Sequence, residues 1–80
     1  MENYFAVFHE DDKGYWVEFP DLPGCLTQGE SKQKALDMAK DALGLYLDNN
    51  FDVKSPSSYK DIEALYPNEL IMSIECNLRS

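Results

Sequence analysis

Apolar and polar residues alternate in short runs near both ends of the chain, which predicts β-strands there. Two runs rich in aromatic and β-branched residues occupy 4–9 and 15–19, and a polar turn between them ends at Gly14. Because this connection is short, we expect an antiparallel hairpin in which alternate residues share a face. Residues 26–28 predict a third short strand, and the alternation over 70–76 predicts the last one.

A longer period begins after Ser31, a favourable helix N-cap residue. Apolar residues then recur every three or four positions, as on one face of a helix. This apolar stripe consists of Ala35, Leu36, Ala39, Ala42, Leu43, Tyr46 and Leu47. Lys34 stands where a capping box has Glu or Gln. We expect the helix to end near Asn49-Asn50, because asparagine tolerates a left-handed cap.

A second, shorter helix is predicted over 59–65, after a turn-forming stretch at 54–58 in which Ser57 or Ser58 could cap it. Pro67-Asn68 ends it before the last strand. The element order β-β-β-α-(short helix)-β predicts one α+β domain over residues 1–80, with an antiparallel-rich sheet and one main helix on one face.

The opposite face of this sheet is expected to carry Trp16, Glu18 and Ile71, because these residues alternate with the core-facing ones. Such a surface must be covered by another element or remain a partly apolar patch. We therefore expect association, and self-association through an edge strand is one form of it.

The stretch FPDLPGCLTQGE, residues 19–30, concentrates the turn-forming residues Pro20, Pro23, Gly24 and Gly29. A dense group of such residues marks a loop that must hold one shape. We expect them to fix the turn between the second and third strands so that sheet and helix pack correctly.

The chain has 80 residues and a formal net charge of −8. Direct nucleic-acid binding is disfavoured, since phosphate contacts require Lys and Arg. The charge favours a basic protein partner, although the same charge also serves solubility alone. The sequence shows neither a signal peptide nor an apolar run of membrane-spanning length, so we expect a cytoplasmic protein without membrane contact.

Residues with catalytic potential are sparse. His9 is the single histidine and is expected to be exposed and inert, and no catalytic triad, Walker loop or zinc-ligand spacing is present. The two cysteines, Cys25 and Cys76, are expected to be reduced and buried. Carboxylates can bind a metal ion, and four acids are candidates for this role: Asp12, Glu18, Asp21 and Glu75. A solvated acidic face is the simpler interpretation. We predict no cofactor, no metal and no catalytic residue.

The segment from Glu18 to Ser31, FPDLPGCLTQGES with its preceding Glu, resembles the HicB antitoxin family. Tyr4–Phe8, the Gly14-Tyr15 strand start, Ala35-Leu36 and the Pro56-Ser57-Ser58 stretch extend the resemblance over nearly the whole chain. The resemblance implies a partly reduced ribonuclease-H-like fold without nuclease activity. It also implies an antitoxin that neutralises a HicA toxin, a small basic mRNA-cleaving protein, by masking its active surface.

The sequence departs from the family pattern in two places. Lys34 replaces an acid often found early in the family's helix. Many family members also carry a C-terminal helix-turn-helix or ribbon-helix-helix segment, whereas this sequence stops at Ser80 after the last predicted strand. Operator binding by this chain is therefore doubtful, and it is either a short solitary member or lacks that segment.

Partner contacts are predicted from charge and expected exposure, at Glu10, Asp11, Asp12, Trp16, Glu18 and Asp21. Two alternatives stay open. One is a dimeric interaction module without a toxin, and the other is a residual metal-dependent nuclease on the same fold.

Overall fold

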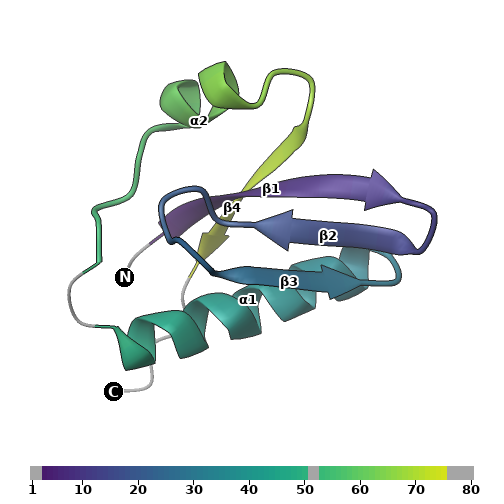
Figure 1. Cartoon of the computed structure of the whole chain (residues 1–80), viewed down its shortest axis with the longest axis horizontal. Helices are drawn as coiled ribbons and strands as arrows, with labels where there is room; N and C mark the ends of the chain where they lie inside the picture. Colours follow the sequence, from purple (N-terminus) through teal and green to yellow (C-terminus); the bar gives the residue numbers. More distant parts are fainter. Residues whose placement is uncertain (1–2, 51–52, 76–80) are drawn as a thin grey trace.

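The computed structural model describes residues 3–50 and 53–75. Its elements are β1 (Asn3–Asp11), β2 (Gly14–Glu18), β3 (Leu26–Gly29), α1 (Lys32–Asn49), α2 (Tyr59–Leu65) and β4 (Leu70–Glu75). The four strands form one antiparallel sheet in the order β3-β2-β1-β4 (Figure 1). This arrangement confirms the predicted α+β fold and element order. Cys76, expected to be buried at the end of the last strand, lies outside the described residues.

One face of the sheet packs against α1. In β1, Tyr4, Ala6 and Phe8 point to this face, and the register places Phe8 opposite Val17 of β2. The predicted helix stripe supplies the other half of the core, because Ala35, Ala39 and Leu43 are fully buried. The small alanines let α1 lie close against the sheet, and burial of this apolar surface is the main favourable term in folding.

The opposite face of the sheet is partly covered by α2, which Figure 1 shows on the other side of the sheet from α1. Val7 of β1 and Ile62 of α2 are both buried, and the Phe5 ring meets Tyr59 edge-on at 5.7 Å. The predicted main helix lies on one face, and the predicted short helix covers part of the second face. The helix α2 thus provides part of the cover that the second face of the sheet is expected to need.

The start of α1 agrees with the prediction, and its C-terminal cap differs from it. Ser31 caps the start by accepting a hydrogen bond from the Lys34 N–H at 3.1 Å, as predicted. At the other end, the expected left-handed asparagine cap is wrong, because Asn50 has an extended backbone with φ −136°. Instead, the side-chain amides of Asn49 and Asn50 donate to the carbonyls of Leu45 and Tyr46. The bond to Tyr46 satisfies one of the last four carbonyls, which a helix end otherwise leaves without partners.

Within residues 3–50 and 53–75, neither helix combines the length and the apolar character needed to cross a membrane.

Candidate partner-binding surface

The turn between β2 and β3 is held by its own backbone. The Phe19 N–H donates to the Cys25 carbonyl at 3.2 Å, and the Leu22 and Cys25 N–H groups donate to carbonyls inside the turn at 2.9 and 3.0 Å. Gly24 has φ +83°, a conformation that side chains disfavour. These bonds and the positive φ of Gly24 define the shape of the turn, and the contribution of Pro20 and Pro23 to its rigidity stays a prediction.

The turn is also fastened to α1, because the Tyr46 hydroxyl donates to the Pro23 carbonyl at 3.0 Å. Gly29 serves the packing for a different reason. A Cβ at this position would lie 2.4 Å from the backbone nitrogen of Ala35. Gly29 therefore lets the start of α1 approach the end of β3, a close contact that any larger residue would block.

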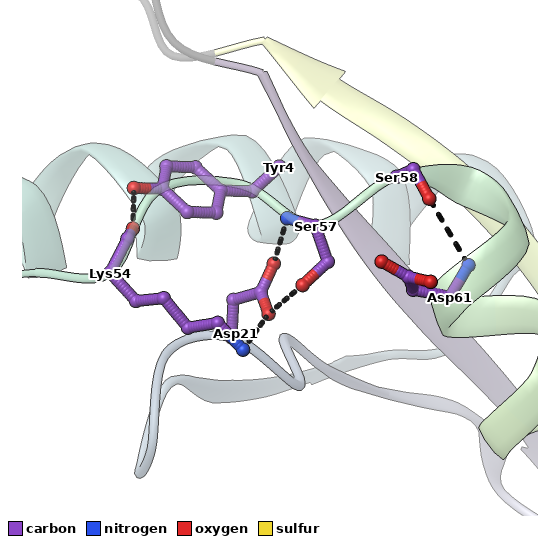
Figure 2. A network of polar contacts seen from close by, with 6 residues as sticks. All are labelled: Tyr4, Asp21, Lys54, Ser57, Ser58 and Asp61. Carbon is purple, nitrogen blue, oxygen red and sulfur yellow. Dashed lines mark hydrogen bonds and ion pairs between the residues drawn. The ribbon is translucent and has the colours of Figure 1, made fainter.

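Asp21 lies at the centre of a buried polar network rather than on the surface (Figure 2). Its carboxylate accepts hydrogen bonds from the Ser57 N–H at 2.6 Å and the Ser57 hydroxyl at 2.7 Å, and the Lys54 ammonium lies 3.1 Å away. The Tyr4 hydroxyl donates to the Lys54 carbonyl at 2.6 Å. The expectation that Asp21 is exposed was wrong, since the residue is only 5% exposed. We name this group of residues the Asp21 clamp, because it fastens the 53–58 connection to the β2–β3 turn.

The clamp changes the acidity of Asp21. Burial alone raises the pKa of a carboxyl group, but the bonds from Ser57 and the Lys54 charge outweigh burial and bring the pKa of Asp21 below 3.8. Asp21 is therefore charged at neutral pH and its charge is compensated inside the protein. Ser58, the neighbour of Ser57, caps α2 by accepting from the Asp61 N–H at 3.2 Å.

The β1–β2 hairpin presents three of the predicted contact residues to solvent. Glu10, Asp11 and Asp12 are all exposed. Asp11 accepts the Lys13 N–H at 2.9 Å, which stabilises the tip of the hairpin, and the other two carboxylates extend the acidic surface. These side chains can meet a partner without unfolding any part of the domain.

Trp16 and Glu18 belong to a cluster around His9 on the same face as α2. The rings of His9 and Trp16 stack at 4.1 Å, which follows from their direct pairing across β1 and β2. His9 Nε2 lies 2.7 Å from a Glu18 oxygen, and His9 Nδ1 lies 3.4 Å from Glu69. The Tyr66 hydroxyl donates to the other Glu18 oxygen at 3.2 Å. We call these five residues the His9 cluster.

The expectation that His9 is exposed was wrong, since only 17% of its side chain is accessible. Burial, followed by the charge and hydrogen bond of Glu18, raises the pKa of Tyr66. The hairpin register could have revealed the His9–Trp16 pair from sequence. The contacts with Tyr66 and Glu69 could not have been found in this way, because they join segments far apart in the chain.

The described residues hold no group of three or more His, Cys, Asp or Glu side chains suited to a metal ion. Burial raises the pKa of the Cys25 thiol to about 11, so this cysteine stays protonated and unreactive at neutral pH. What the surface does offer is exposed carboxylates beside stacked aromatic rings. Such an arrangement is suited to contacting another protein.

The fold and this surface together define a small α+β domain that presents acidic and aromatic groups. The family described as HicB_like antitoxin of bacterial toxin-antitoxin system matches residues 4–71. The chain belongs to this HicB-like antitoxin family, as the resemblance in its sequence predicts.

Curated relatives agree with the family assignment. The chain is 34% identical over 70 residues to Antitoxin HicB 1 of Photorhabdus laumondii, covering 78% of this chain and 45% of the relative. It is 37% identical over 59 residues to Antitoxin HicB 2 of the same organism, covering 69% of this chain and 42% of the relative. The chain thus spans less than half of the length of these two relatives.

Solved structures share the fold. The N-terminal domain of Burkholderia pseudomallei antitoxin HicB superposes with a TM-score of 0.81 at 20% identity, over 95% of this chain and 99% of that chain. A chain of a HicA3 and HicB3 toxin-antitoxin complex superposes with a TM-score of 0.73 at 18% identity, over 95% of this chain and 99% of that chain.

Proposed function

We propose that this chain is an antitoxin domain that binds a small basic HicA-type toxin in the cytoplasm and masks the toxin's active surface. Membership of the HicB-like family is the observation that carries the proposal. A chain of a HicA3 and HicB3 complex with the same fold supports the choice of partner.

The net charge of −8 supports electrostatic capture of such a partner. An acidic surface steers a basic protein towards it and raises the association rate. The exposed hairpin acids, Glu10, Asp11 and Asp12, are the contacts we propose for this step, together with Trp16 and Glu18. Asp21 has an internal structural role, and we leave it out of the proposed contact surface.

The first experiment measures binding and inhibition together. The chain and its cognate HicA-type toxin are purified separately, their affinity is measured, and cleavage of an RNA by the toxin is followed as the chain is added. We expect cleavage to stop at an equimolar ratio. Active toxin in the presence of saturating chain would refute masking, and absence of binding would refute the antitoxin proposal itself.

The same assay addresses the nuclease alternative. The chain alone is incubated with RNA and Mg²⁺ or Mn²⁺, and we expect no cleavage. Metal-dependent cleavage that stays with the chain through purification would instead favour a nuclease. Sedimentation of the chain alone tests the dimeric module, and a stable dimer that binds no toxin would favour it.

A charge-reversal pair tests the steering step. Replacing Glu10 and Asp12 by Lys should lower the association rate by about tenfold at low salt and flatten its salt dependence. The double replacement of Glu63 and Glu75 by Lys is the matched control, since it changes the net charge equally on other exposed positions. Equal effects of the two pairs would mean that only the net charge matters and not the hairpin.

A further inference from the structure

Along one side of the molecule, β3 runs beside α1 (Figure 1). Several exposed apolar side chains belong to this region. The described residues include seven exposed large hydrophobic side chains, and four of them lie here. They are Trp16, Leu26, Met38 and Leu45, with 37%, 60%, 40% and 65% of their surfaces accessible. The other three, Tyr59, Leu65 and Leu70, belong to α2 and β4.

The surface at these four residues is hollowed in two places. One hollow of about 430 Å³ is lined by Trp16, Leu26 and Met38, with Thr27 and Gln28. A second hollow of about 290 Å³ lies between Leu26 and the C-terminal half of α1, including Leu45. Leu26 borders both hollows, and we call the two neighbouring hollows together the β3 groove.

The backbone of β3 adds a second feature to the groove. β3 is at the end of the sheet order and pairs with β2 alone among the described strands. Its outer row of backbone N–H and C=O groups can therefore accept an additional strand. Addition of an extended segment to an open sheet edge is a common mode of peptide recognition, in which neighbouring pockets receive alternate side chains.

The charges beside the groove select the occupant. Asp41 is three residues after Met38 and four before Leu45, so the three side chains are neighbours on the helix surface. Asp37 is one turn before Asp41, and both aspartates are exposed. The adjoining surface near Met38 is lined by two basic residues, Lys13 and Lys34, and by two acidic ones, Asp11 and Glu30. A second copy of this chain would bring a further −8 charge against this acidic border, whereas a basic partner would be attracted to it.

We infer that the β3 groove binds an extended segment of a basic protein partner, which pairs with β3 and places apolar side chains against Leu26 and Met38. The inference rests on the proposed function, in which that partner is the HicA-type toxin, and assigns the groove as the surface where the toxin docks. The hairpin acids then steer the encounter, and the groove supplies the buried contact that keeps the complex together.

Matched substitutions test the groove against the purified cognate toxin. Leu26→Lys places a charge on the shared wall of both hollows, where it repels a basic partner. Leu65→Lys makes the same change on α2, where the side chain is 71% exposed. Because both positions are exposed, both variants should fold, and a thermal unfolding measurement on each variant checks this. We expect Leu26→Lys to weaken toxin binding by at least about tenfold, mainly through faster dissociation, and Leu65→Lys to change it by less than about twofold.

Hydrogen exchange of the wild-type chain with and without toxin gives an independent readout. The outward amides of β3 should gain protection in the complex, because they acquire hydrogen-bond partners. Loss of affinity in Leu26→Lys alone together with protection of β3 supports the inference.

The remaining outcomes overturn it in distinguishable ways. Wild-type binding with equal affinities for both variants would exclude the groove and leave the proposed function intact. No binding by the wild type would overturn both proposals. Self-association that Leu26→Lys abolishes while toxin binding is unchanged would show that a second copy occupies the groove.

Discussion

The two faces of the sheet are built from different kinds of contact. The face towards α1 is a continuous apolar core in which Phe8, Val17 and Leu43 are buried together. The face towards α2 combines two buried apolar side chains, Val7 and Ile62, with the His9 cluster. The first face is stabilised mainly by loss of apolar surface from water, and the second depends in addition on satisfied polar groups. The α1 side of the sheet is therefore held mainly by apolar packing, whereas the α2 side is held by apolar and polar contacts together.

The largest expected effect is on the α1 face. Leu43→Ala removes a fully buried side chain from the centre of the core and should lower the free energy of unfolding by about 3 kcal/mol. For a domain of this size, that is a large part of the total stability. Denaturant titration followed by Trp16 fluorescence measures it. A loss below about 1 kcal/mol would mean that the core repacks around the cavity.

The corresponding change on the other face should lower the free energy of unfolding by a smaller amount. Ile62→Ala also removes a buried aliphatic side chain, but the short helix α2 can shift towards the sheet to fill the space. We expect a loss of about 2 kcal/mol, measured by the same titration. A loss larger than that of Leu43→Ala would reverse the comparison and make α2 the more firmly packed layer.

Close approach of backbone to backbone on the α1 face gives the next prediction. Gly29→Ala should destabilise the fold by about 2 kcal/mol, because its Cβ would meet the backbone of Ala35 and push α1 away from β3. Gly44→Ala is the matched control inside α1, where a Cβ has no atom within 4 Å. It should stabilise the protein by about 0.5–1 kcal/mol, the usual gain of Ala over Gly in a helix. Equal destabilisation by both changes would contradict the packing role of Gly29.

The Asp21 clamp joins segments that the periodicity of the sequence does not connect. Asp21→Asn keeps the shape of the side chain but replaces one accepting oxygen by an NH₂ group, which cannot accept from Ser57 or Lys54. The free energy of unfolding should fall by about 1–2 kcal/mol at neutral pH. Asp37→Asn is the exposed control and should change stability by less than about 0.5 kcal/mol. Equal stability of the two variants would contradict the clamp.

The clamp also predicts a pH dependence. The folded-state pKa of Asp21 lies below 3.8, so its ionised form stabilises the fold above that pH, and the contribution is lost as the pH falls through the folded pKa. The difference in unfolding free energy between wild type and Asp21→Asn should therefore be constant above about pH 5 and shrink in more acidic solution. A difference that grows on acidification would contradict the lowered pKa.

The sequence predicted the elements of the fold because each has a local signal. The three- and four-residue spacing of Ala35, Ala39 and Leu43 indicates a helix face without knowledge of its neighbours. The dense turn at 19–25 was predicted for the same reason, since its residues restrict their own backbone.

The candidate surface was predicted less completely because its contacts are long-range. The Asp21–Ser57 bonds span 36 residues and the Glu18–Tyr66 bond spans 48, so no local pattern indicates either. Local sequence therefore predicts an exposed acid at Asp21, which is buried, and an exposed His9, which packs against Trp16. The hairpin acids were predicted correctly as exposed, because a polar turn between two strands has little that could cover it.

The smallest expected effect is within the His9 cluster. Tyr66→Phe removes the hydroxyl that donates to Glu18 but leaves the ring beside His9. Because Glu18 keeps its contact with His9 and is partly accessible to water, we expect a loss of only about 0.5 kcal/mol. Tyr59→Phe is the control at the start of α2, where the ring packs against Phe5 at an exposed position, and it should leave the stability unchanged. A loss above about 2 kcal/mol in Tyr66→Phe would mean that the polar cluster, and not Ile62, holds α2 on the sheet.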